Sequence, residues 1–133
     1  MRTLTDPLAR ILISVIFMAS GAMKLTHFNA TAHMIGEKGI PLATVATAVA
    51  ILIEVGGGIM IVIGWQTKLA AAAQFVYLIP VTLLYHNFWA APPELHDLQA
   101  INFLKNVAIM GGLLILAARG AGASSVDGGT AHS

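Results

Sequence analysis

Apolar residues fall into four continuous runs along the chain, separated by short polar segments. The runs extend roughly over residues 7–27, 41–64, 69–88 and 99–118. Each has about the 20 residues that a helix needs to cross a hydrocarbon core of ~30 Å. The runs do not alternate between apolar and polar positions, which disfavours transmembrane strands, and their Ala, Leu and Met content favours helix. The pattern predicts an all-α, integral membrane four-helix bundle.

The segments between the runs carry turn and helix-boundary signals. Asp6 and Pro7 can begin the first helix, since proline fits a first turn and an acidic side chain favours the positive end of the helix dipole. Gly39-Ile40-Pro41 separates the first two spans, and residues 64–68 form a short turn before the third. Residues 29–38 are expected to form a short helix at the membrane surface.

Composition supports a membrane protein. Hydrophobic residues make up 57% of the 133 residues, and the mean hydropathy is +0.81. Charged residues make up only 10%, whereas a soluble domain averages about 25%. The alternative is a soluble subunit buried entirely in a larger complex.

A net charge of +1 gives no argument for nucleic acid as a partner. The chain has no cysteine, which excludes disulfides, thiolate metal sites and a thiol redox relay.

The distribution of Lys and Arg predicts the orientation. With four spans, one side of the membrane receives Arg2, Arg10, Lys68 and Arg119, and the other side has Lys38 as its clear loop cation. The positive-inside rule then places both termini in the cytoplasm. Residues 1–118 form the membrane domain, and residues 119–133 are small and polar, so we expect a disordered C-terminal tail. The expected location is the bacterial inner membrane, crossed several times.

A secretory signal peptide is the alternative interpretation of the first run. Arg2 and Arg10 resemble a basic leading region, and Ser20-Gly21-Ala22 resembles a cleavage site. Cleavage there would remove the helix that carries Lys24, and no soluble domain would follow for export. We therefore expect the first run to remain as a span.

One acidic residue interrupts the second run. Glu54 is the only charged residue in the range 39–67, and an acidic side chain at mid-span costs about 2.5–3.5 kcal/mol on insertion scales. Ala46, Ala50 and Gly58 share a helical stripe with Glu54 at spacings of four residues, and small residues let a neighbouring helix approach closely. We expect Glu54 to face the interior of the bundle, either neutral and hydrogen-bonded or paired with a base.

Polar residues on the other spans are its candidate partners. They are Lys24, His86, Lys105, Asn102 and Asn106. Glu54 lies deeper than either lysine, so that a contact with Lys24 or Lys105 requires the second helix to begin a few residues late. Simpler roles remain open for each group: the lysines can snorkel to the interface, His86 can be interfacial, and the asparagines can join helices.

The third span carries further candidates for a pocket. Pro80 interrupts the helix and frees the carbonyl of Val76, and Gln74, Tyr77 and Tyr85 lie on the same span. Of these, Tyr85 is a candidate ligand or proton-relay residue, together with Glu54 and its candidate partners. Four histidines lie on or near the outer side, but no pair has a tight ligand spacing on one helix, so no metal site is predicted.

The ordered set of motifs resembles the DoxX family of small bacterial membrane proteins. The resemblance extends from about Leu8 to Ala118. The motifs are SGAMKL (20–25), GIP (39–41), IEVGGG (53–58), GWQTKLAA (64–71), TLLYHNFW (82–89) and FLKNVAIMGG (103–112). The family's recurring polar positions correspond here to Lys24, Glu54, His86, Lys105 and Asn106.

The resemblance implies a membrane subunit of a redox, sulfur-metabolism or oxidative-stress system. Such a subunit would hold a soluble redox enzyme or a second membrane subunit at the lipid bilayer, and would bind a quinone or a small substrate near Glu54. It can be an accessory rather than a catalytic subunit, and it can form a homo-oligomer. No covalent cofactor is expected. The alternatives are a small proton-coupled transporter, with Glu54 as its titrating group, and a non-catalytic membrane assembly factor.

Overall fold

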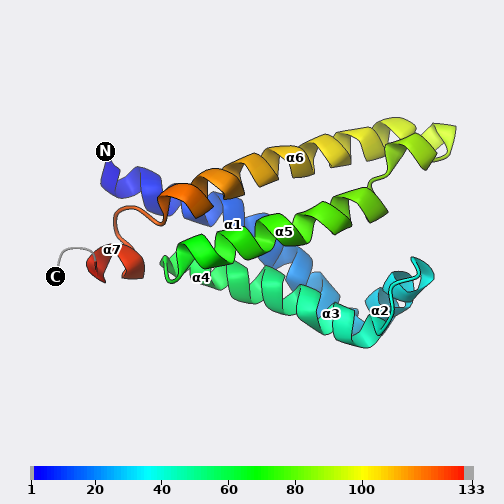
Figure 1. Ribbon diagram of the computed structural model, residues 1–133, viewed down its shortest axis with the longest axis horizontal. Coiled ribbons are helices and arrows are strands. Elements are labelled where there is room, and N and C mark those ends of the chain that lie inside the picture. The colour runs from blue at the N-terminus through cyan, green and yellow to red at the C-terminus, as the bar shows by residue number, and fades with distance from the viewer. Residues whose placement is uncertain (1, 131–133) are drawn as a thin grey trace.

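The computed structural model describes residues 2–130, and every regular element in this range is helical. The elements in chain order are α1 (Arg2–Thr26), α2 (Phe28–Glu37), α3 (Ala43–Ile51), the π-helical turn η1 (Leu52–Gly56), α4 (Gly57–Ile63), α5 (Thr67–Tyr85), the short 3₁₀ helices η2 (Phe88–Ala90) and η3 (Pro93–Leu95), α6 (His96–Arg119) and α7 (Val126–Thr130). Helices α3, η1 and α4 form one continuous rod (Figure 1).

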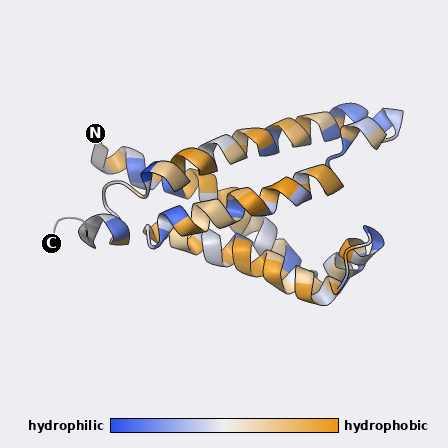
Figure 2. Ribbon diagram, in the orientation of Figure 1, coloured by the Kyte–Doolittle hydropathy of each residue, from blue (hydrophilic) through white to orange (hydrophobic). Residues whose placement is uncertain are grey.

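Four helical segments are long and apolar enough to cross a membrane. They cover Leu4–Thr26, Ala43–Ile63, Thr67–Ala90 and Pro93–Arg119. Large apolar side chains remain exposed along all four, as a surface in contact with lipid requires, and apolar residues predominate along the long helices in Figure 2. The predicted all-α, four-span fold is therefore confirmed. With an even number of spans, the described N- and C-terminal segments lie at the same end of the bundle (Figure 1).

Two predicted helix boundaries shift in the structure. Helix α1 begins at Arg2, so Pro7 lies inside the helix rather than at its start, and Asp6 is not in the first turn. The second span begins at Ala43 rather than at Pro41, because Leu42 adopts a left-handed conformation with φ of 53° immediately before it. The short helix predicted at residues 29–38 is present as α2.

The helices pack closely at the end of the bundle that carries the termini and diverge toward the other end (Figure 1). The buried apolar cluster consists of Phe17, Ile61, Ala70, Ala71, Leu78 and Leu113. Helix α1 packs directly on the second span: a Cβ atom added to Gly21 would lie 2.5 Å from Val55 Cγ2, and one added to Gly58 would lie 2.7 Å from Met18 Cγ. Glycine at these positions permits the close approach of the two helices.

The C-terminal segment differs from the predicted disordered tail. Residues 120–130 fold back on the bundle and end in α7. Arg10, which is only 2% exposed, donates from Nη1 to Val62 O at 3.0 Å and from Nη2 to Ser124 O at 2.7 Å. Both carboxylate oxygens of Asp127 accept bonds of 2.8 Å from the backbone amides of Gln66 and Thr67. Polar contacts hold this segment, although it offers little apolar surface; residues 131–133 lie outside the described range.

Candidate functional site

A pocket of about 820 Å³ opens where the helices diverge. Its walls come from α1, α2, α3, η1, α5 and α6, and most of the lining side chains are apolar, including Phe17, Met34, Ile35, Leu78 and Leu84. Polar groups gather at a few points on the wall. A mostly apolar pocket with a small number of convergent polar groups is the usual form of a small-molecule site.

The π-helical turn η1 brings Glu54 to the pocket wall. The α-helical hydrogen-bond pattern of the second span widens over Leu52–Gly56, and Glu54 lies at the centre of that turn. Gln74 of α5 donates from Nε2 to the carbonyl oxygen of Ile53 within the same turn, over 3.2 Å. A Cβ atom on Gly57 would lie 2.8 Å from this amide nitrogen, so glycine leaves room for the contact. Single π turns occur frequently at functional sites.

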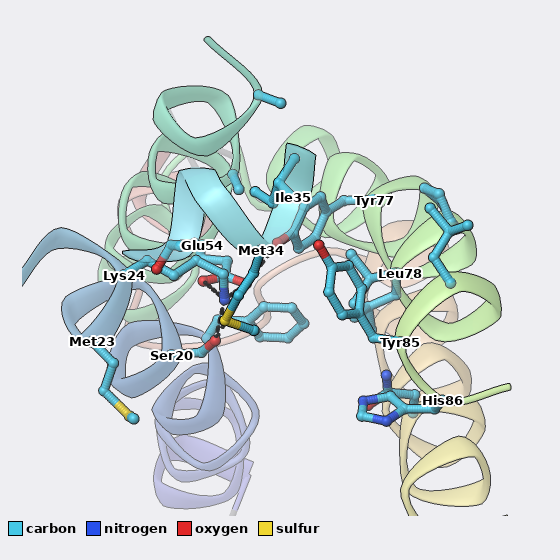
Figure 3. Close-up of a pocket in the computed structure, with 18 of the residues that line it drawn as sticks. Ser20, Met23, Lys24, Met34, Ile35, Glu54, Tyr77, Leu78, Tyr85 and His86 are labelled. Carbon is cyan, nitrogen blue, oxygen red and sulfur yellow. Dashed lines mark hydrogen bonds and ion pairs between the residues drawn. The ribbon is translucent and has the colours of Figure 1, made fainter. Parts of the chain in front are cut away.

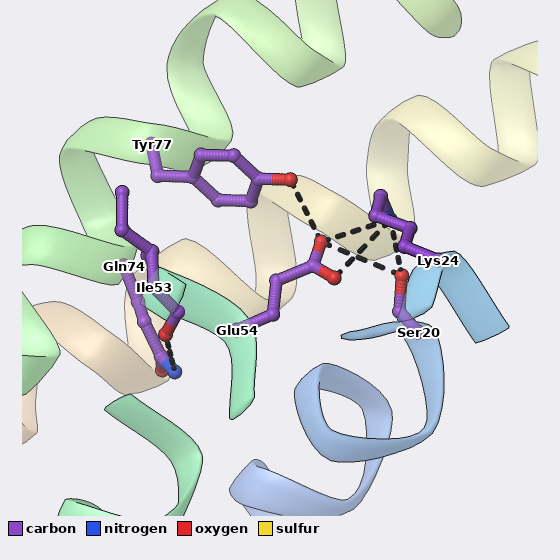
Figure 4. Close-up of polar contacts among 6 residues, drawn as sticks. All are labelled: Ser20, Lys24, Ile53, Glu54, Gln74 and Tyr77. Atoms are coloured by element: carbon purple, nitrogen blue, oxygen red, sulfur yellow. Dashed lines mark hydrogen bonds and ion pairs between the residues drawn. The ribbon is translucent and has the colours of Figure 1, made fainter. Parts of the chain in front are cut away.

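Glu54 forms the centre of a buried polar network (Figure 4). Lys24 Nζ lies 3.1 Å from Oε1 and 3.2 Å from Oε2, and it also donates to Ser20 Oγ at 2.7 Å. The hydroxyl of Tyr77 donates to Oε1 at 2.7 Å, and that of Ser20 donates to the same oxygen over a longer 3.4 Å. Glu54 is only 4% exposed. Donors from α1 and α5 thus compensate a carboxylate that would otherwise be costly in the membrane.

A second group of polar side chains lines the pocket away from this ion pair (Figure 3). His86 Nδ1 lies 2.8 Å from Gln99 Oε1, and Asn106 donates from Nδ2 to Thr82 Oγ1 at 3.0 Å; both contacts join α5 and its C-terminal end to α6. The hydroxyl of Tyr85 is shielded and has no hydrogen-bond partner among the described residues. The ammonium group of Lys38 lies 5.3 Å from the centroid of the Tyr85 ring.

The structure brings together five of the seven residues that the sequence suggests for a site. Glu54, Lys24, His86, Tyr85 and Asn106 line the pocket. Asn102 and Lys105 do not line it. Of the two lysines considered for Glu54, the partner is Lys24.

The position of Lys105 outside the pocket agrees with helix geometry. Lys105 is exposed on α6, while its neighbour Asn106 lines the pocket. Adjacent residues point about 100° apart around an α-helix of 3.6 residues per turn, and on α6 this rotation turns Lys105 outward while Asn106 faces the pocket. From this outward position, the long stem of Lys105 can carry its charge toward the interface.

Two residues in the network were not among the predicted site residues. Ser20 precedes Lys24 by four residues, the spacing that places two side chains on one helix face. Tyr77 precedes Pro80 by three residues, and its sequence context indicates only a neighbour of the proline kink. The spacing signals the Ser20–Lys24 pair, but no local pattern identifies Tyr77 as the donor to Glu54. Among residues 2–130, no group of three or more His, Asp or Glu side chains has a metal-binding arrangement.

The fold and the site together define a class of protein. It is a small four-helix integral membrane protein with a buried ion pair and a pocket between its membrane-spanning helices. The chain belongs to the DoxX family, whose sequence profile matches residues 6–87. It is 33% identical over 120 residues to the inner membrane protein YphA of Escherichia coli K12, covering 90% of this chain and 86% of that protein. It is 32% identical over 119 residues to the inner membrane protein YqjF of the same organism, with the same coverage.

Part of the chain is also similar to a eukaryotic protein. The Surfeit locus protein 4 homolog of Drosophila melanogaster is 35% identical over 72 residues, which cover 52% of this chain and 26% of that protein. No solved structure matches. The two bacterial relatives and the four spans confirm the predicted multi-pass inner-membrane location.

Proposed function

We propose that this DoxX protein is a membrane subunit of a redox or oxidative-stress system and binds a small bilayer-dissolved molecule, a quinone in the first instance, in the pocket beside Glu54. The observation that supports this most is the pocket itself: about 820 Å³, mostly apolar, and bordered by membrane-spanning helices. A quinone has an apolar body with two carbonyl oxygens, which suits apolar walls with a few polar groups.

The electrons would have to pass through the ligand or a partner protein. The chain has no cysteine, and its buried polar network consists of an ion pair and hydroxyl groups, none of which is a ready electron carrier. A soluble redox enzyme or a second membrane subunit, held at the bilayer by this chain, would therefore supply the redox chemistry.

The experiment is purification from native membranes followed by mass spectrometry of bound quinones, lipids and proteins. Ala46 lines the pocket, whereas Ala48 of the same helix is exposed and does not. Ala46→Phe is expected to narrow the pocket and reduce co-purification of the small molecule, and the matched control Ala48→Phe should retain it. Equal ligand content in both variants, at equal protein yield, would contradict the proposal.

A proton-coupled transporter is the alternative function for the same residues. A buried acidic side chain within a span supports it in principle. Lys24 and Tyr77 already donate hydrogen bonds to Glu54, so this carboxylate is engaged within the protein rather than open to a transported ion. Proton uptake by proteoliposomes, lost in Glu54→Gln, would favour the transporter over quinone binding.

A further inference from the structure

The ion pair leaves little hydrogen-bonding capacity for a ligand. An ammonium group has three N–H donors, and Lys24 directs them at Ser20 Oγ and at both carboxylate oxygens of Glu54. The carboxylate in turn accepts from Tyr77 and Ser20. The pair is also neutral as a whole. A ligand that enters the pocket therefore meets no uncompensated charge at this network.

The hydroxyl of Tyr85, unlike the ion pair, has hydrogen-bonding capacity that the protein does not use. Its hydroxyl is the one buried side-chain polar atom among the described pocket-lining residues that has no hydrogen-bond partner. Figure 3 shows the ring directed into the pocket, toward the side where Tyr77 lies. The Lys38 ammonium group over the ring face, 5.3 Å from its centroid, helps to hold this orientation. A buried hydroxyl without a partner is unfavourable, and a ligand that provides one removes that penalty.

We propose that Tyr85 contacts the ligand directly, donating a hydrogen bond to an uncharged oxygen on an otherwise apolar molecule, and that the pocket selects against acids. This inference rests on the proposed occupation of the pocket by a bilayer-dissolved ligand. A carboxylate ligand would need a cation, and Lys24, the one Lys or Arg among the described residues that line the pocket, is already paired with Glu54. Its entry would leave one of two carboxylates without compensation, which is strongly unfavourable in apolar surroundings.

The test compares three probes that share a ten-carbon chain: a tritiated decyl-benzoquinone, decylbenzene without oxygen, and decanoate. Binding of the quinone to the purified full-length protein is measured directly, and the other two compete against it. We expect saturable quinone binding to the wild type, and no competition from decanoate at pH 8. In Tyr85→Phe, the quinone should bind about tenfold more weakly, a typical effect of one lost ligand hydrogen bond, while competition by decylbenzene stays unchanged.

A stability measurement separates ligand contact from a structural role. Because the hydroxyl has no protein partner, Tyr85→Phe should leave the melting temperature of the ligand-free protein unchanged or raise it. The rise in melting temperature on adding the quinone should shrink. A lower melting temperature without ligand, wild-type affinity of Tyr85→Phe for the quinone, or equal competition by decanoate would overturn this inference and leave the pocket proposal standing. Absence of saturable quinone binding to the wild type would overturn both.

Discussion

Glu54 and Lys24 form an ion pair inside this bundle. Each would be costly alone at this depth, and together they are compensated by a contact of 3.1 Å and by hydroxyl donors. The pair is asymmetric, since the side chain of Lys24 is 25% exposed and that of Glu54 is 5% exposed. The carboxylate is therefore the partner that loses more when the other is removed.

We predict that removing either charge destabilises the protein and that removing both does not. Glu54→Gln should lower the stability by about 3 kcal/mol, because it leaves a partly buried cation without its counter-ion. Lys24→Met should cost at least as much, because the carboxylate is more deeply buried. The double variant should recover most of the loss, since a neutral amide and an apolar side chain need no counter-ion. Unfolding in detergent by heat or denaturant measures all three.

The control is Tyr77→Phe, which removes one donor to the carboxylate and keeps the ion pair. Its cost should be about 1.5–3 kcal/mol, as expected for a hydrogen bond to a charged group. A double variant as unstable as the sum of the two single variants would mean that Glu54 and Lys24 do not interact energetically. Wild-type stability of Glu54→Gln, with function lost, would instead indicate that Glu54 is neutral and acts by binding a proton or a ligand.

At the scale of the elements, the contact between α1 and η1 sets the position of Glu54. Gly21 of α1 lies against the backbone of the π-helical turn: an added Cβ atom would lie 3.2 Å from Val55 N and 3.1 Å from Glu54 Cβ. The helices cannot approach in this way with a larger side chain at residue 21. The geometry of the ion pair therefore depends on a glycine that takes no part in it.

We predict that Gly21→Ala is destabilising while Gly111→Ala is tolerated. The alanine at residue 21 would overlap Val55 and push η1 away from α1, at a cost of about 1–3 kcal/mol for an overpacked contact. At Gly111 of α6 an added Cβ atom meets nothing within 4 Å. Both positions are inside helices, so the intrinsic gain in helix propensity is similar for the two. Melting temperatures that fall equally in both variants would contradict this role of Gly21.

The docking of α7 is also an element-scale feature, and it depends on pH through Asp127. Partial burial raises the pKa of this carboxyl, but the hydrogen bonds from Thr67 and Gln66 and the charge of Arg10 lower it more, so that the net pKa lies below its ordinary value. A carboxyl with a depressed folded-state pKa contributes stability that is present above its unfolded pKa, about 3.9. That contribution is lost as the pH falls through the folded-state value.

We therefore predict that the wild type is more stable than Asp127→Asn at pH 6, and that this difference shrinks as the pH falls below about 4 toward the folded-state pKa. Melting temperatures of the two proteins in detergent, measured in parallel from pH 7 to pH 3, test this. Protease sensitivity of residues 120–130 should rise over the same interval in the wild type. A stability difference that does not change with pH would show that the ionised carboxylate does not hold α7.

At the scale of the whole molecule, the even number of spans places both described terminal segments at one end of the bundle (Figure 1). The same end carries Arg10, Lys68 and Arg119, whereas Lys38 lies in the loop after α2 at the other end. By the positive-inside rule we predict that the termini are cytoplasmic. A reporter active only outside the cytoplasm should be inactive after Ser133 and active when inserted at Gly39. The reverse pattern would overturn the predicted orientation.

The sequence by itself determined the class of fold, the approximate spans and the presence of a polar interior. Hydropathy is a sum over consecutive residues, and the bilayer fixes how many of them a helix needs, so these properties are local along the chain. Glu54 could be placed inside the bundle because a charge at mid-span has no alternative partner in lipid. Five of the seven suggested site residues do line one pocket.

Only the tertiary structure decided which residues meet. The pairing of Glu54 with Lys24 rather than Lys105 depends on the rotation and relative depth of three helices, and the donor role of Tyr77 depends on the π-helical turn. The attachment of residues 120–130 depends on Arg10 and on free amides at the start of α5, more than 50 residues away. Such contacts join segments distant in sequence, and a shift of one residue turns a helical side chain by about 100°, so that local patterns do not specify them.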